Sequence, residues 1–120
     1  GSEHIPPDAL EVPQRMEAYF EFYIKNKNRM HPVILAAEMH ERLVTIHPFI
    51  DGNGRTARLV MNFILLKHGH ALAILKGDLN SRLDYYKSLE MAQIGNITEP
   101  FYNLIIDKAL ESLKEHLKLV

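Results

Sequence analysis

One stretch near the middle of the chain, from His47 to Arg58, gathers several kinds of reactive side chain. Gly52 and Gly54 flank an asparagine there, and glycine lets backbone N–H groups come close to a ligand. An apolar run with helical spacing follows at once, so we predict a loop that becomes a helix at Gly54 or Arg55. Such a helix N-terminus is a typical phosphate site, because unpaired N–H groups and the positive end of the helix dipole meet there.

The side chains of this stretch also suit phosphate chemistry. Arg55 and Arg58 stand three positions apart, hence on one helix face, and guanidinium forks match phosphate oxygens. Asp51 supplies a hard oxygen ligand, and Mg²⁺ is usually held by one or two carboxylates together with phosphates. His47 can titrate near neutrality, which suits a general base. Each feature alone is also common for purely structural reasons, and it is their combination that favours a functional site.

The same residues resemble the signature of Fic-domain proteins. That signature is a histidine, a phenylalanine two positions later, an acidic residue, Gly-Asn-Gly-Arg and a second arginine, and every fixed position is matched. The resemblance extends from about His4 to about Ile106. Most Fic enzymes transfer AMP from ATP to a hydroxyl side chain of a target protein. The resemblance therefore implies a nucleotidyltransferase that uses ATP and Mg²⁺ and modifies Ser, Thr or Tyr of a protein partner.

The resemblance also implies a role for each residue of the motif. His47 would be the base that takes the proton from the target hydroxyl, and Phe49 would point into the core and fix the loop. Asp51 would hold Mg²⁺ at the α- and β-phosphates, and Arg58 would contact the γ-phosphate. The remaining nucleotide contacts would form the anion hole: Gly52, Asn53, Gly54, Arg55 and Thr56.

A second group of nucleotide contacts is implied further along the chain. Tyr85 and Tyr86 resemble the pair that frames the base and ribose, and Leu89 would pack against adenine. Gln93 stands where family members often have asparagine, and its longer amide would have to reach the base. The same tyrosines fit equally well a capped, half-exposed helix face.

The N-terminal segment invites two interpretations. Residues 1–12 carry two prolines and no helical period, so they are predicted to be extended. By resemblance they are the remnant of a β-hairpin flap, with His4, Ile5 and Pro6 docking the target by strand-like pairing. The alternative is a plain N-terminal arm. Gly1 and Ser2 are interpreted as a cloning scar.

Regulation is a further implication of the resemblance. Many Fic proteins are held inactive by a helix with Ser or Thr, three variable residues, Glu and then Gly or Asn. Its Glu pairs with the second motif arginine, here Arg58. No segment of this chain matches the pattern. We therefore expect an inhibitory helix upstream or an antitoxin partner, and no internal inhibition from acidic residues such as Glu111 or Glu115.

Composition narrows the class of protein. A chain of 120 residues, 47% hydrophobic and 24% charged, is the size of one domain with a real core. A formal net charge of −1 favours neither nucleic acid nor an anionic membrane as a partner. The absence of cysteine is compatible with a reducing compartment, and no signal peptide or long apolar run is evident. We expect a cytoplasmic location.

Apolar periodicity predicts an all-α, Fic-fold bundle of about five helices and a single domain of residues 1–120, with a helical core over 13–118. The helix opened by Gly54 is expected to be the central buried one. Asn62 within it should satisfy backbone groups, Gly69 should end it, and Asn80 or Ser81 should cap the next. His31 and His40 fit no zinc spacing and are interpreted as structural or surface residues. The predicted helices are 13–27, 32–46, 54–67, 80–93 and 98–117.

Two alternative functions remain open. Fic relatives can phosphorylate, transfer phosphocholine or remove AMP from a modified target, and the intact Gly52–Arg55 half of the motif favours AMP transfer among these. The other alternative is a non-catalytic helical interaction module. That alternative gives no reason for His47 and Asp51 to occur together.

Overall fold

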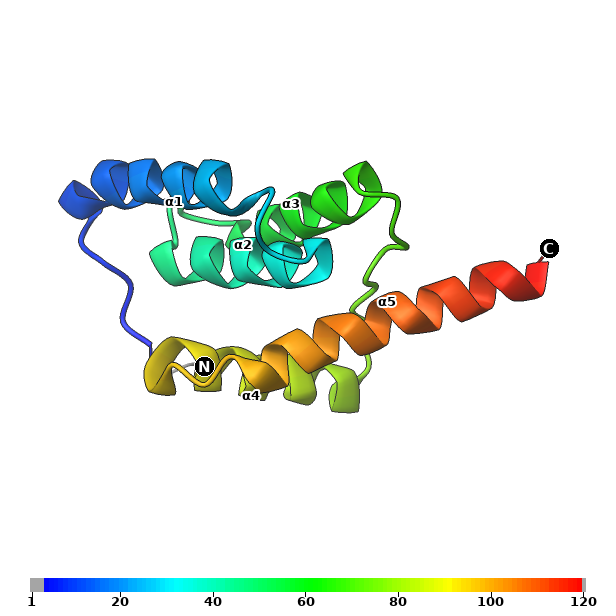
Figure 1. The fold of residues 1–120 in the computed structure, drawn as a ribbon. Coiled ribbons are helices and arrows are strands. Elements are labelled where there is room, and N and C mark those ends of the chain that lie inside the picture. Colours follow the sequence, from blue (N-terminus) through cyan, green and yellow to red (C-terminus); the bar gives the residue numbers. More distant parts are fainter. Residues whose placement is uncertain (1–3, 120) are drawn as a thin grey trace.

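The computed structural model describes residues 4–119, and within that range the chain is helical without any strand (Figure 1). The prediction of an all-α fold with five helices is confirmed. A short 3-10 turn, η1, precedes the first helix. The elements are η1 Ala9–Glu11, α1 Val12–Asn26, α2 Pro32–Ile46, α3 Asn53–Lys67, α4 Leu79–Gly95 and α5 Glu99–Leu119.

The five helices form two layers. In Figure 1, α1, α2 and α3 lie together on one side, and α4 and α5 run beneath them. The far end of α5 projects beyond the other helices, so the described residues measure 50 × 34 × 25 Å. Helix α2 packs against α1, α3, α4 and α5, which makes it the central element. The end of α2 carries a loop whose residues His47, Phe49, Ile50 and Asp51 are exposed at the surface.

The expectation that the helix after Gly54 would be the central buried one is wrong. Helix α2 has the longer list of buried residues, whereas Leu59, Phe63 and Leu66 of α3 are 60–71% exposed. These three residues are spaced four and then three positions apart, so they share one outward face of α3. Because apolar side chains make up much of any folded surface, an apolar stripe does not by itself identify a buried helix.

Capping details explain where the helices start and stop. Asp78, rather than Asn80 or Ser81, caps α4, and its carboxylate accepts from the Ser81 N–H at 3.1 Å. Pro32 stands at the start of α2, and the His31 ring accepts from the Val33 N–H at 3.2 Å, so the structural role of His31 is confirmed. Gly69 follows the C-cap His68 with φ +77°, the left-handed conformation that glycine adopts most readily.

Asn62 of α3 anchors the connector, the segment of residues 70–76 that leads from α3 to α4. Its amide donates to the Ala73 carbonyl at 3.2 Å and accepts from the Ala73 N–H at 2.8 Å. The prediction that Asn62 satisfies backbone groups is therefore confirmed. This pair of bonds holds Ala73, in the connector between α3 and α4, against α3.

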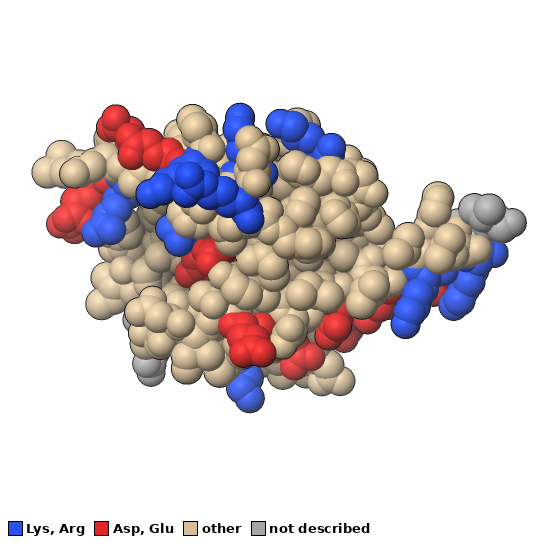
Figure 2. All heavy atoms as spheres, in the orientation of Figure 1, with Lys and Arg blue, Asp and Glu red and all other residues tan. Residues whose placement is uncertain are grey.

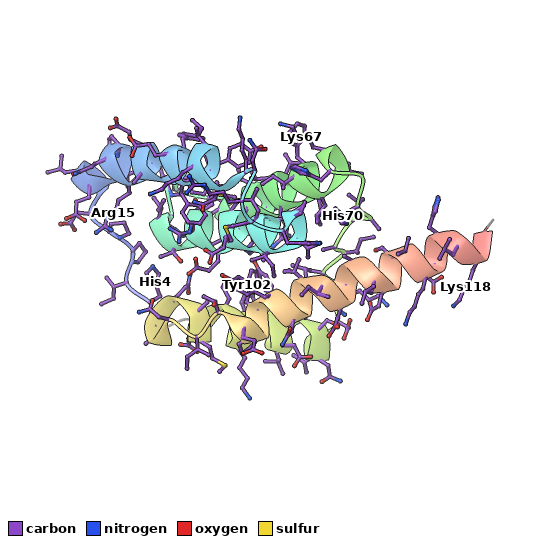
Figure 3. The ribbon with its side chains drawn as sticks, viewed as in Figure 1. His4, Arg15, Lys67, His70, Tyr102 and Lys118 are labelled. Carbon is purple, nitrogen blue, oxygen red and sulfur yellow. The ribbon has the colours of Figure 1, made fainter. Side chains whose placement is uncertain are left out.

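Residues 4–8 have no regular secondary structure, and no hairpin is present in residues 4–119. His4 is nevertheless tied to the domain, because its Nε2 lies 2.8 Å from the carbonyl of Thr45 in α2 (Figure 3). Ile5 is 85% exposed, and Pro6 is exposed as well. The part of the flap prediction that falls on residues 1–3 lies outside the described residues.

The surface carries mixed charge. On the face shown in Figure 2, Lys and Arg side chains alternate with Asp and Glu, and neither sign dominates. Within residues 4–119, no helix has both the length and the apolar character that crossing a bilayer requires.

Candidate active site

The motif loop begins with a sharp change of direction at the end of α2. His47 is the C-cap, with φ 55° and ψ 58°, and its N–H donates to the Leu43 carbonyl at 3.0 Å. A left-handed residue ends the helix and leads the chain away from the helix axis, and histidine tolerates this conformation better than most residues. The His47 side chain is exposed. The predicted base therefore stands at the surface, where an incoming hydroxyl can reach it.

Asn53, not Phe49, fixes the shape of the loop. The Asn53 amide accepts from the Phe49 N–H at 2.9 Å and donates to the Phe49 carbonyl at 2.8 Å. Asn53 is 6% exposed, whereas Phe49 is 48% exposed. The expectation that the Phe49 ring points into the core is wrong, because an amide carries the donor and the acceptor that this backbone needs. The Asn53 side chain is thus engaged within the protein and leaves only its backbone N–H for an anion.

The first turn of α3 presents backbone donors. The Thr56 N–H donates to the Gly52 carbonyl at 3.0 Å, and the Gly52 N–H donates to Asp51 at 2.8 Å. No side chain caps α3, so the N–H groups of residues 53–55 precede the first bond within the helix. Gly52 has φ +82°, and a Cβ there would lie 3.2 Å from the Arg55 guanidinium. Glycine at this position therefore permits both the turn and the close approach of Arg55.

Arg58 folds back over this first turn. A Cβ at Gly54 would lie 3.1 Å from Nη1 of Arg58, so the glycine leaves room for the guanidinium. Arg58 lines a cavity of about 220 Å³ between α3, the connector and α4. Lys76 and Arg82 line it too, and no motif in the sequence marks these two residues. The complete lining, which includes no acidic side chain, is Arg58, Leu75, Lys76, Gly77, Arg82, Tyr85 and Tyr86.

A buried pair of polar residues lies behind Arg58. The Tyr85 hydroxyl lies 2.9 Å from Nε2 of His40, and these residues are 7% and 0% exposed. Burial raises the pKa of Tyr85, although the charge and hydrogen bonding of Arg58 oppose this. Burial, and then the charge of Arg58, lowers the pKa of His40 to about 3. His40 is structural rather than superficial. The sequence did contain a signal for this role, because His40 lies inside the apolar run of α2. A polar side chain that is buried in such a run needs a hydrogen-bond partner.

Acid is expected to destabilise the fold through His40. Because the pKa of His40 is about 3 in the fold and about 6.5 in the unfolded chain, the unfolded state binds more protons below pH 6.5. The contribution of neutral His40 is therefore present above pH 6.5 and is lost as pH falls towards 3, by up to about 1.4 kcal/mol per pH unit. Urea unfolding at pH 7 and pH 5 measures this loss. The loss of unfolding free energy between pH 7 and pH 5 should be smaller in His40→Leu than in the wild type. Equal losses in these two proteins would contradict the lowered pKa of His40.

The structure brings only some of the predicted nucleotide contacts together. Tyr86 is 57% exposed and lies at the Arg58 cavity, so its ring is available to a ligand, whereas Leu89 is 8% exposed and belongs to the core. The Gln93 amide donates to the Thr45 hydroxyl at 3.1 Å and lines a separate cavity of about 310 Å³ between α1, α2 and α4. Leu89 and Gln93 therefore lie outside the cavity that Arg58, Tyr85 and Tyr86 share.

The donor set suits a metal bound jointly with phosphates. Among residues 4–119, no group of three or more His, Asp or Glu side chains could hold a metal ion by itself. Asp51 is exposed beside the uncapped end of α3. One carboxylate next to a phosphate site fits Mg²⁺, which keeps several waters and takes its other ligands from the substrate.

Comparison with known proteins identifies the family. The model of the Fic/DOC family matches residues 1–65, more than half of the 120 residues, and the chain belongs to the Fic/DOC family. The Protein adenylyltransferase Fic of Nematostella vectensis is 41% identical over 105 residues, which cover 87% of this chain and 24% of that protein. The protein of the same name from Drosophila grimshawi is 40% identical over 116 residues, 95% of this chain and 23% of that protein.

Solved structures agree with this assignment. A Fic-1 fragment from C. elegans aligns with a TM-score of 0.82 and 29% identity, over 98% of this chain and 35% of that one. A Fic-domain-containing signaling protein from Bacteroides thetaiotaomicron aligns with a TM-score of 0.83 and 29% identity, over 91% of this chain and 46% of that one. The fold is therefore that of Fic domains, and the chain spans about a quarter of the length of the curated relatives it matches.

Proposed function

We propose that this domain transfers AMP from ATP to a Ser, Thr or Tyr hydroxyl of a protein substrate. The observation that carries the proposal is the uncapped start of α3, which follows the exposed His47 in the chain and precedes Arg58 at its cavity. This succession supports a reaction that needs a base, a set of phosphate donors and a cation. Relatives named protein adenylyltransferase support the same reaction.

The proposed reaction is a displacement at the α-phosphorus. His47 accepts the proton of the target hydroxyl, whose oxygen bonds to the α-phosphorus while the bond to the bridging oxygen breaks and pyrophosphate leaves. The N–H groups of residues 53–55 and the Arg55 guanidinium bind the phosphate oxygens, which favours the negative charge at the reacting centre. Asp51 would hold Mg²⁺, and the bound ion would neutralise charge on the phosphates.

Labelled ATP separates this reaction from its alternatives. Protein that keeps label from the α-position but not from the γ-position has received AMP, whereas retained γ-label means phosphorylation. Release of AMP from a pre-modified target would instead support removal of AMP. His47→Ala serves as the inactive control in each incubation.

Calorimetry addresses the interaction-module alternative. ATP should bind more tightly with Mg²⁺ than without it, and Asp51→Asn should reduce that difference because it removes the carboxylate ligand. Glu17→Gln, which changes an exposed carboxylate on α1, is the matched control. Binding that ignores Mg²⁺, or no binding, would favour a non-catalytic module.

Arg58→Ala is expected to weaken ATP more than ADP. Arg58 lies one helical turn beyond Arg55 and lines the adjoining cavity, so it should reach the outermost phosphate. Loss of one charge-assisted contact is expected to weaken ATP binding by about 1.5–3 kcal/mol, or roughly 10- to 140-fold. Calorimetric titration of both nucleotides measures the difference. Lys87→Ala is the control, since Lys87 is exposed on α4 and does not line the cavity. Equal losses for ATP and ADP would refute the γ-phosphate assignment.

The regulatory expectation stays a prediction. Within residues 4–119, Glu111 pairs with Lys108 at 3.5 Å and Glu115 with Lys118 at 3.1 Å, and no ion pair involves Arg58. An inhibitory helix or antitoxin would supply an acidic partner for Arg58. Adding such a segment should lower activity and compete with ATP.

A further inference from the structure

Three polar side chains from three helices meet behind the Arg58 cavity. His40 belongs to α2, Arg58 to α3 and Tyr85 to α4. The Tyr85 hydroxyl lies 2.9 Å from Nε2 of His40, and Tyr85 lines the same cavity as Arg58, whose charge acts on it. Phe101 of α5 closes the group, with its ring centre 5.1 Å from that of His40 and 6.4 Å from that of Tyr85. The arrangement is therefore packed on every side except the one that Arg58 presents to the cavity.

The direction of the hydrogen bonds follows from the groups themselves. A guanidinium can only donate. With Arg58 donating to the Tyr85 oxygen, the Tyr85 hydroxyl donates to Nε2 of His40, from which it lies 2.9 Å away. The proton of the neutral imidazole then sits on Nδ1, which is buried without a partner. An unpaired buried donor is destabilising, so leucine and phenylalanine in place of His40 and Tyr85 would serve the core better. The histidine is thus poorly explained by packing alone.

Arg58 needs a restraint because of its neighbours. Lys76 and Arg82 line the same cavity and repel its guanidinium, and among residues 4–119 no ion pair holds it. The absence of a Cβ at Gly54 leaves space for the Arg58 side chain but offers it no hydrogen bond. The Tyr85 hydroxyl is the polar group that remains to fix it, and His40 in turn fixes the hydroxyl.

We propose that His40 and Tyr85 are positioning residues that hold the Arg58 guanidinium ready for the outermost phosphate of ATP. The inference rests on the proposed function for the identity of the anion. Without this support Arg58 would have to be ordered when ATP binds, and the entropy of ordering its long side chain would reduce the affinity.

The first test needs no nucleotide. Proton–nitrogen NMR of the arginine Nε–H groups, with Arg58 assigned from the signal lost in Arg58→Lys, reports how ordered each guanidinium is. Tyr85→Phe keeps the ring and removes only the hydroxyl, so it should lower the order of Arg58 and leave Arg15 unchanged. Unchanged order at Arg58 would overturn the proposal.

The second test separates positioning from packing. His40→Leu combined with Tyr85→Phe removes both the unpaired Nδ1–H and the hydroxyl that would lose its acceptor. The unfolding midpoint of this double variant should therefore equal or exceed that of the wild type while ATP affinity falls about 3- to 10-fold. His40→Gln, whose amide oxygen can replace Nε2 as the acceptor, should restore much of the affinity. A role in packing alone predicts that stability and affinity fall together, and that result would overturn the proposal.

A double-variant comparison connects the effect to Arg58. Tyr85→Phe should weaken ATP but not AMP, and it should have no further effect on ATP in the Arg58→Ala background. Tyr102→Phe is the matched control, because Tyr102 of α5 donates its hydroxyl to Glu38 of α2, apart from the cavity (Figure 3). Equal weakening of ATP by Tyr85→Phe in both backgrounds would refute positioning through Arg58. Should the order of Arg58 fall as expected while no protein binds ATP, the proposed function fails and the restraint of Arg58 stands.

Discussion

His47→Ala is expected to lower the rate of AMP transfer by about 10²–10⁴-fold, with ATP affinity nearly unchanged. The imidazole is exposed at the end of α2, ahead of the N–H groups of residues 53–55, and in the proposed reaction it would meet the attacking hydroxyl rather than the phosphates. The α-label assay measures the rate, and calorimetry measures the affinity. Full transferase activity in the variant would rule out His47 as the base.

Two further variants are controls for a change in the backbone conformation of the loop. Alanine disfavours the left-handed conformation that His47 adopts at φ 55°, so His47→Ala could also disturb the loop. Asparagine accepts that conformation and has no imidazole, so His47→Asn should be equally inactive. His68→Ala, at the exposed end of α3, should keep full activity.

Phe101→Ala is expected to destabilise the domain by about 3–5 kcal/mol, a large part of the 5–15 kcal/mol typical of a whole domain. The Phe101 ring is 1% exposed and packs on His40 and Tyr85, so its removal leaves a cavity between the two layers. Urea unfolding measures the change. The opening behind Tyr85 should also weaken ATP binding in the fraction that stays folded.

Leu110→Ala provides the comparison on the same helix. Leu110 is 47% exposed, and surface substitutions usually change stability by no more than about 0.5 kcal/mol. Similar losses of unfolding free energy in Phe101→Ala and Leu110→Ala would contradict the view that the buried Phe101 ring anchors α5.

The sequence predicted the helices well because the signals involved are local. Apolar spacing and Pro32 place α2 at residues 32–46, and the observed bounds agree. The loop between α2 and α3 was predictable for the same reason, since its glycines and amide act within a few residues of one another. The helix that follows the loop therefore begins at Asn53, next to the Gly54 or Arg55 start that the pattern predicts, although the Phe49 ring lies outside the core.

Features that depend on distant residues were not predictable. The apolar residues of α3 do not reveal which face meets another helix, so the choice of α3 over α2 as the central helix was wrong. The partner of His40 is Tyr85, which is 45 positions away, and no local pattern connects them. Gln93 bonds to Thr45, which lies 48 positions away, and no local pattern connects these two residues either.

The two layers have a consequence for local unfolding. The bonds that shape the motif loop join Phe49 to Asn53, four positions apart, whereas the bond behind Arg58 joins α2 to α4. Hydrogen exchange resolves such regions as separate cooperative units when their opening free energies differ. A partial opening that releases α4 would break the His40–Tyr85 bond and leave the loop folded. In exchange experiments the amides of α4 should therefore lose protection before those of the first turns of α3. The proposed contact between Arg58 and the outermost phosphate would then be lost while the motif loop is still folded.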